Sequence, residues 1–140
     1  LSDDDIRRRQ ASPAALDGLL AASDFISIHS PLTDQTKDMI NTQAFAKMKN
    51  GVRLVCAARG GVIDEAALLA ALESGKVAGA ALDVFATEPP GLTPLTAHPK
   101  VIGTPHVGAQ TAEAQTRAGI DIAEEVAAVL EGRQARWKVW

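Results

Sequence analysis

The stretch GVRLVCAARGGVIDEAALLAALESG, residues 51–75, decides the fold. Residues 52–57 are short and mostly apolar, which is typical of a β-strand covered on both faces of a sheet. Asp64 can cap a helix that runs through Ser74, with leucines at helical spacing, and Gly75 is suited to the left-handed turn that ends a helix. The stretch therefore predicts a strand, a loop and a helix in succession.

Further elements of the same kind lie on both sides of this unit. The expected strands cover residues 24–29, 77–84 and 100–104. The expected helices are a short one that Ser12 caps and Pro13 starts, one capped by Asn41 or Thr42, and a long one over residues 111–130. Strands that alternate with helices in this way predict an α/β fold with a doubly wound parallel sheet.

Composition excludes several classes of function. The 140 residues carry 14 basic and 17 acidic side chains, which predicts no broad basic surface for nucleic acid or for an anionic membrane. The basic run at residues 7–9 follows three aspartates at residues 3–5, whose charge opposes it. One cysteine excludes an internal disulfide, and no apolar run approaches the roughly 18 residues that span a bilayer. We expect a soluble, cytoplasmic protein.

The carboxyl ends of parallel strands meet at one edge of a sheet, where ligands bind. Arg59 follows the strand at residues 52–57 and precedes two glycines, so it can hold a substrate carboxylate with two parallel hydrogen bonds. The simpler alternative is an arginine that binds carbonyl groups of its own loop. His29, Ser30 and Pro31 follow the first strand at the same predicted edge.

His106 and Glu88 complete the candidate chemistry. A histidine just past a strand can exchange a proton near neutral pH, and a nearby carboxylate would orient its ring. A loop histidine bound to backbone and a solvated glutamate before two prolines are the plainer alternatives. Asp83 ends a strand where it can face a ligand amide or cap the following turn.

Two other kinds of site are not indicated. His29 and His98 lack metal-ligand spacing to each other, to His106 and to Cys56, so we predict no metal site. No glycine pattern of the form G-x-G-x-x-G occurs in the sequence, so these residues do not contain the turn that cradles the phosphates of a dinucleotide.

Four stretches resemble the NAD-dependent D-2-hydroxyacid dehydrogenases, the family with D-3-phosphoglycerate dehydrogenase and hydroxypyruvate reductase. They occur in the family's order: DFISIHSPL at 24–32, GVRLVCAARGGVIDEAAL at 51–68, GAALDVFATEP at 79–89 and VIGTPHVGA at 101–109. The resemblance implies the second half of the NAD-binding domain, a partial Rossmann-like sheet that lacks its first strands and its glycine-rich turn. One departure is Cys56, where the family commonly has asparagine.

The resemblance also implies residue roles. Arg59 would hold the substrate carboxylate and polarise the carbonyl, His106 would be the acid/base, and Glu88 its hydrogen-bonding partner. The implied cofactor is NAD, with NADP not excluded, and the substrate a small 2-hydroxy or 2-oxo acid bound by a homodimer. The positions implied to contact the cofactor are His29, Ser30, Pro31, Ala57, Arg59, Asp83, His106 and Gly108.

These implications lead to an expected organisation. Residues 1–11 form a polar lead-in, residues 12–110 the helix–strand core, residues 111–132 a long helix, and residues 133–140 a basic tail with two tryptophans that need cover. We expect the strand at residues 24–29 to have an unpaired edge. We also expect the 140 residues to be a fragment, inactive alone, or a natural short form whose partner covers that edge.

Two alternatives to a dehydrogenase stay open. A dehydrogenase-like fold can serve NAD(H)-regulated association without catalysis, as in the corepressors that resemble this family and keep similar residues. A remnant without a function of its own is the other alternative.

Overall fold

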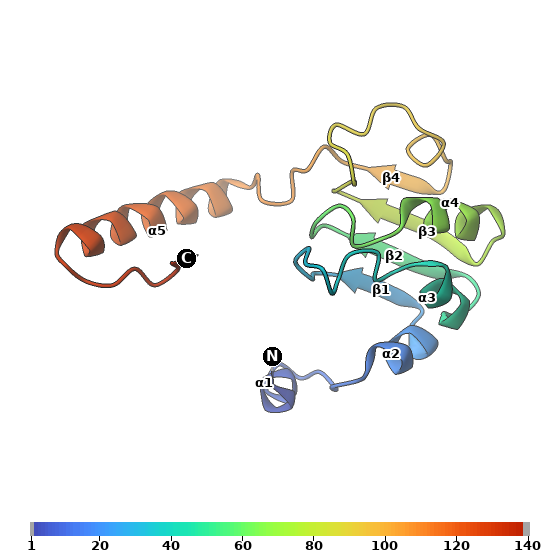
Figure 1. Cartoon of the computed structure of the whole chain (residues 1–140), viewed down its shortest axis with the longest axis horizontal. Coiled ribbons are helices and arrows are strands. Elements are labelled where there is room, and N and C mark those ends of the chain that lie inside the picture. Colours follow the sequence, from blue (N-terminus) through green and yellow to red (C-terminus); the bar gives the residue numbers. More distant parts are fainter. Residues whose placement is uncertain (1, 139–140) are drawn as a thin grey trace. The chain divides into compact units, whose positions relative to one another are not determined.

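The computed structural model describes residues 2–138 and divides into two compact units, residues 1–105 and 106–140, which are treated separately. The strands of the first unit are β1 (Phe25–Ile28), β2 (Val52–Cys56), β3 (Val77–Leu82) and β4 (Val101–Gly103). Its helices are α1 (Asp3–Arg8), α2 (Leu16–Ala22), α3 (Thr42–Lys47) and α4 (Glu65–Glu73). The second unit contains α5 (Ala112–Leu130) (Figure 1).

The sheet is parallel throughout, and its order β1-β2-β3-β4 follows the chain. The predicted α/β fold with a parallel sheet is confirmed, and β1 lies at an edge as expected. The register is as informative as the order. Ile28 pairs with Cys56, Cys56 pairs with Leu82, and Leu82 pairs with Gly103, so the four strands end on one line across the sheet.

Within the first unit, helices cover one face of the sheet and leave the other face open. Helices α2, α3 and α4 lie on one side, where α3 packs against both of the other helices and α4 packs against β3 (Figure 1). Along β2, buried and exposed residues alternate, with Leu54 buried and Val55 42% exposed. Within the first unit, this strand is covered on one face only, so the predicted cover on both faces is not found there. On the open face, the Arg53 guanidinium lies 5.6 Å from the centre of the Phe25 ring.

Helix α4 follows directly from its sequence. The Asp64 carboxylate accepts hydrogen bonds from the amides of Ala66 and Ala67, at 3.0 and 3.1 Å, which satisfies two donors of the first turn. Leu68 and Leu72 are fully buried, and Gly75 follows the helix with a φ of 77°. This helix is therefore a firm support for the loop that precedes it.

The N-terminal expectation is wrong about where the second helix begins. Within the expected polar lead-in, the structure forms α1, which has no buried residues and begins where Ser2 and Asp5 make a reciprocal capping box. The next helix does not start at Ser12 and Pro13: the chain stays extended through Ala15, which caps α2 without a side-chain hydrogen bond. Burial, not capping, marks this helix, since it places Leu20 in the core.

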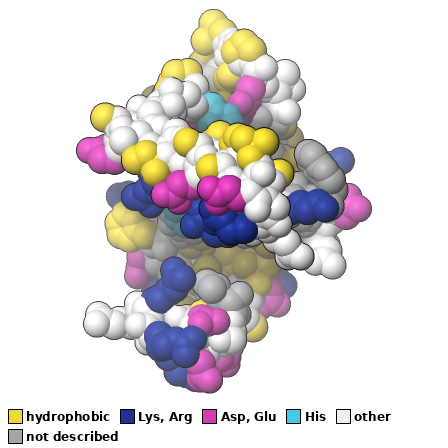
Figure 2. Space-filling view, turned by 90° about the vertical axis from the view of Figure 1, so that its left-hand side faces the viewer, with side chains coloured by type: hydrophobic (Ala, Val, Ile, Leu, Met, Phe, Trp, Pro, Cys, Tyr) yellow, Lys and Arg dark blue, Asp and Glu magenta, His cyan; other side chains and the backbone are white. Residues whose placement is uncertain are grey.

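The charged run on α1 is balanced, as the sequence predicts. Arg7 pairs with Asp3 and Asp4, and Arg8 pairs with Asp5. Figure 2 shows basic and acidic side chains next to one another at the bottom of the view, the end of the molecule where Figure 1 places α1. Within residues 2–138, no helix combines the length and apolar character that crossing a bilayer requires.

In the second unit, the tail folds back on α5. Thr111 caps the helix, and Gly132 ends it with a φ of 77°. Arg136 then forms ion pairs with Glu124 and Glu125, and its guanidinium lies 4.6 Å from the centre of the Trp137 ring. Arginine thus covers part of a tryptophan that is 58% exposed, while Trp140 lies outside the described residues.

This contact should depend on pH. The hydrogen bond from Arg136 holds the pKa of the Glu125 carboxyl below its ordinary value of 4.5. A lowered pKa means that the contact is present at neutral pH and is lost as the pH falls through the folded-state pKa, below 4.5. In W140F, whose only tryptophan is Trp137, we expect a fluorescence change on acidification from pH 7 to 3. E125Q should flatten this change, whereas E131Q should leave it; an unaltered profile in E125Q would contradict the assignment.

Candidate active site at the carboxyl ends of the strands

The aligned strand ends place four loop starts along one rim of the first unit. His29 follows β1, Ala57 follows β2, Asp83 follows β3 and Thr104 follows β4. Because the last residues of the four strands pair in register, these four residues begin their loops side by side. The expected clustering of the strand ends is therefore present in this unit.

An open groove lies between the loops that follow β1 and β2. Its volume is about 380 Å³, which is in the range of small-molecule sites. The lining residues are His29, Ser30, Pro31, Leu32, Ala58 and Arg59. Four of them are predicted site residues. Leu32 and Ala58 were missed. Each is next in the sequence to a predicted site residue, and this adjacency could have identified them.

Two polar side chains at this groove have defined partners. The Ser27 hydroxyl and the His29 Nε2 atom form a hydrogen bond of 2.7 Å, which orients the imidazole ring at the carboxyl end of β1. The Arg59 guanidinium donates one hydrogen bond to the Ala58 carbonyl, at 2.7 Å. The simpler alternative for Arg59, a contact with its own loop, is thus present. That bond uses one of five donors, so the guanidinium can still bind a planar anion.

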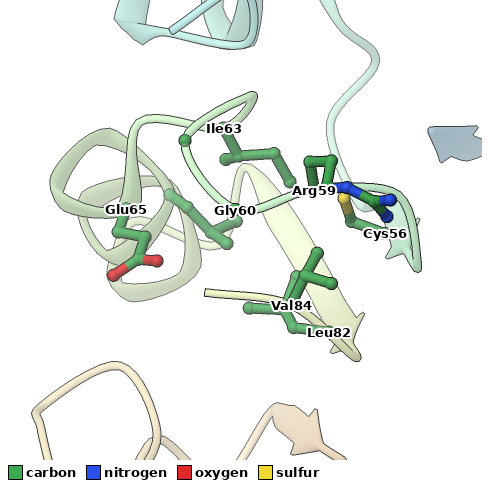
Figure 3. Close-up of a pocket in the computed structure, with 9 residues that line it drawn as sticks. Cys56, Arg59, Gly60, Ile63, Glu65, Leu82 and Val84 are labelled. Atoms are coloured by element: carbon green, nitrogen blue, oxygen red, sulfur yellow. The ribbon is translucent and has the colours of Figure 1, made fainter. Parts of the chain in front are cut away.

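A second, much smaller cavity lies beneath Arg59. Its volume of about 10 Å³ is that of about one water molecule, and Cys56, Gly60, Leu82 and Val84 contribute to its lining. Figure 3 shows the Arg59 guanidinium pointing away from this cavity, with Glu65 on its opposite side. The arginine is therefore oriented outward, away from the core.

Gly60 brings the loop that carries Arg59 against the loop that follows β3. A Cβ atom at position 60 would lie 1.8 Å from the Phe85 carbonyl oxygen and 2.2 Å from its carbon. Only glycine allows this approach, because a side chain would occupy the space of the Phe85 backbone. The two loops are therefore in direct contact within the first unit.

Two carboxylates hold the loop after β3. Glu88 accepts a hydrogen bond from the Phe85 amide at 3.0 Å, and Glu65 accepts one from the Ala86 amide at 2.6 Å. Glu88 is exposed, as expected for a solvated loop residue. Its carboxylate is nevertheless held by the hydrogen bond from the Phe85 amide. Glu65 was missed from the sequence, because an acidic residue in the first turn of a helix is common for electrostatic reasons alone.

Asp83 is a buried carboxylate at the end of β3. It is 8% exposed, and it accepts a hydrogen bond from the Thr104 hydroxyl. Its amide donates to the Cys56 carbonyl at 2.9 Å. Asp83 thus joins the ends of three neighbouring strands, which was not apparent from the sequence.

His106 and Gly108 belong to the second unit and are described within it. His106 has a φ of 55°, a left-handed conformation that is uncommon for residues other than glycine and concentrates at functional sites. The convergence of His106 with Arg59 and Glu88 stays a prediction. Among the residues that the structure describes, no group of three histidine, cysteine or acidic side chains is arranged to hold a metal ion.

Comparison with known proteins places this geometry in a family. Residues 2–108 match the family described as D-isomer specific 2-hydroxyacid dehydrogenase, NAD binding domain. D-3-phosphoglycerate dehydrogenase from Bacillus subtilis (strain 168) is 48% identical over 132 residues, which are 94% of this chain and 25% of that protein. The chain thus spans about a quarter of the length of this relative.

Solved structures agree with the sequence relatives. D-lactate dehydrogenase with NAD+ from Lactobacillus jensenii is 34% identical with a TM-score of 0.83, over 93% of this chain and 43% of that one. A D-isomer specific 2-hydroxyacid dehydrogenase from Xanthobacter autotrophicus Py2, in complex with NADPH and MES, is 38% identical with a TM-score of 0.78, over 86% and 50%. The chain belongs to the D-isomer specific 2-hydroxyacid dehydrogenases, as a Rossmann-like NAD-binding domain.

The close contact at Gly60 can be tested by adding one methyl group. We expect Gly60→Ala to lower the free energy of unfolding by about 1–3 kcal/mol, since the Phe85 backbone must move. Gly18→Ala is the matched control: nothing lies within 4 Å of its Cβ position inside α2, so a gain of about 0.5–1 kcal/mol is expected. Urea unfolding of both variants measures the difference, and equal stabilities would refute the close approach.

Proposed function

We propose that this chain supplies the carboxylate-binding and proton-transfer side of an NAD-dependent D-2-hydroxyacid dehydrogenase. The observation that carries the proposal is the rim at the aligned strand ends, where the Arg59 loop contacts the loop that carries Glu88. Family membership supports the reaction type. Turnover also requires a phosphate-binding turn outside these 140 residues; an assembly that contains the chain and such a turn is called the complete enzyme below.

The residues at the rim fit a nicotinamide cofactor. The groove that His29, Pro31 and Ala58 line is open and partly apolar, which suits the planar rings and sugars of a nucleotide. When bound, NAD(H) supplies or accepts the hydride. We propose that His29, Ser30 and Pro31 line its path, with Ala57, Asp83 and Gly108 as further contacts.

The chain's own residues would divide the remaining work. The Arg59 guanidinium binds the substrate carboxylate and, as a fixed positive charge, polarises the adjacent carbonyl. An imidazole nitrogen of His106 donates its proton to the carbonyl oxygen during reduction and takes the proton back from the hydroxyl during oxidation. Glu88 orients that ring. The homodimer, the cytoplasmic location and the inactivity of the isolated chain stay predictions.

The proton-transfer role is tested at His106. In the complete enzyme, His106→Asn should lower kcat for NADH with glyoxylate or hydroxypyruvate by about 100-fold or more, because the proton donor is lost. Asparagine tolerates the left-handed backbone of this position, so the fold and NADH binding should persist. His98→Asn is the control. The Nδ1 atom of His98 accepts a hydrogen bond from the Lys100 amide, outside the rim. An unchanged kcat in His106→Asn would refute the role.

The anion-binding role is tested at Arg59. Arg59→Lys keeps the positive charge but removes the planar pair of donors, so the KM for the 2-oxo acid should rise about 10-fold or more while NADH affinity changes little. Arg53→Lys changes the same residue type on the open face of the sheet and should leave both constants unaltered. Equal KM values in the two variants would contradict the assignment.

A further inference from the structure

Glu65 is a carboxylate that the proposed reaction does not use, and it stands beside the residues that do. It is the first residue of α4, and it reaches across to the Ala86 amide with an oxygen–nitrogen distance of 2.6 Å. Ala86 lies two residues before Glu88, on the loop that follows β3. A side chain on one element thus holds the backbone of another, 21 residues away along the chain.

The support for Glu65 is rigid. Asp64 caps α4 immediately before it, and Leu68 anchors the next turn in the core without any exposed surface. The partial positive charge at the start of a helix also favours a carboxylate at this position. Glu65 is half-buried, so its side chain has few alternative directions.

The loop that Glu65 holds has a different character. The Phe85 amide donates to Glu88, which is a bond within the loop, whereas the Ala86 amide donates to Glu65, which joins the loop to the body of the fold. Phe85 is buried and Ala86 is exposed. If the bond to Glu65 is lost, water can satisfy the exposed Ala86 amide, so little stability is lost. Phe85 stays against Gly60, but the segment from Ala86 to Glu88 loses its hydrogen bond to α4 and can shift.

We propose that Glu65 is a positioning residue that holds the 85–88 loop so that the Glu88 carboxylate is presented in one orientation. The proposal rests on the proposed function, because a fixed Glu88 matters most if it orients a proton-transferring histidine. On this proposal, Glu65 at the start of α4 affects kcat rather than folding or cofactor binding. Small displacements of positioning groups cost about 100-fold in rate.

Two substitutions of Glu65 separate the effect of side-chain length from the effect of charge. Glu65→Gln keeps the length of the side chain and an oxygen that accepts from the Ala86 amide, so kcat should stay within about threefold of wild type. Glu65→Asp keeps the charge but is one methylene shorter, so it should lose the bond and lower kcat by about 10-fold to 100-fold. The KM for NADH and the melting temperature should change little in both. A role of the negative charge alone predicts the reverse order.

The same helix offers a control. Glu73 is exposed at the last residue of α4, at the opposite end of the helix from Glu65, and Glu73→Asp should leave kcat unaltered. These measurements use the complete enzyme with NADH and a 2-oxo acid. Wild-type kcat in Glu65→Asp, or a loss in Glu65→Gln as large as in Glu65→Asp, would overturn the proposal.

Amide hydrogen exchange in the 140-residue chain tests the contact without turnover. The Ala86 amide should be protected in wild type and Glu65→Gln, and it should exchange at least 10-fold faster in Glu65→Asp. No turnover by the wild-type complete enzyme would overturn the proposed function and the rate role of Glu65 together, while the exchange pattern would still report the contact. Turnover with equal Ala86 exchange in all three proteins would overturn the role of Glu65 alone.

Discussion

The hydrogen-bond register of the sheet is the constraint on which the site depends. Because Ile28, Cys56, Leu82 and Gly103 pair in one row, four loops leave the sheet at the same height. A shift of one residue in any strand would turn its last side chain to the other face and displace the loop that follows. The groove, the buried Asp83 and the outward Arg59 are all consequences of this alignment.

The loops are then fixed to each other rather than only to their strands. Gly60 lies directly against the Phe85 backbone, and the carboxylates of Glu65 and Glu88 hold two consecutive amides of the neighbouring loop. Contacts of this kind order a polar rim without burying much apolar surface. Apolar packing therefore stabilises the covered face of the sheet, whereas hydrogen bonds and the Gly60 contact set the positions of the loops at the rim.

Sequence reasoning succeeded where the signals are local. Asp64 and Gly75 mark the ends of α4 because capping and left-handed turns depend on neighbouring residues. It failed at Ser12, whose cap is not used, and it did not reveal that, within the first unit, the apolar strand at residues 52–57 is covered on one face only. Contacts between distant segments, such as Glu65 with Ala86, could not be read from spacing, because they depend on how two loops meet.

The order of the strands has a consequence for how the chain acquires its structure. Among the described strands, β2, β3 and β4 each pair with the strand that precedes them in the chain, so this part of the sheet can lengthen in one direction as the polypeptide leaves the ribosome. The connections between consecutive strands are of similar length, about 20 residues, so each step carries a similar entropy cost of loop closure. The layer that supports the rim can thus form by stepwise addition.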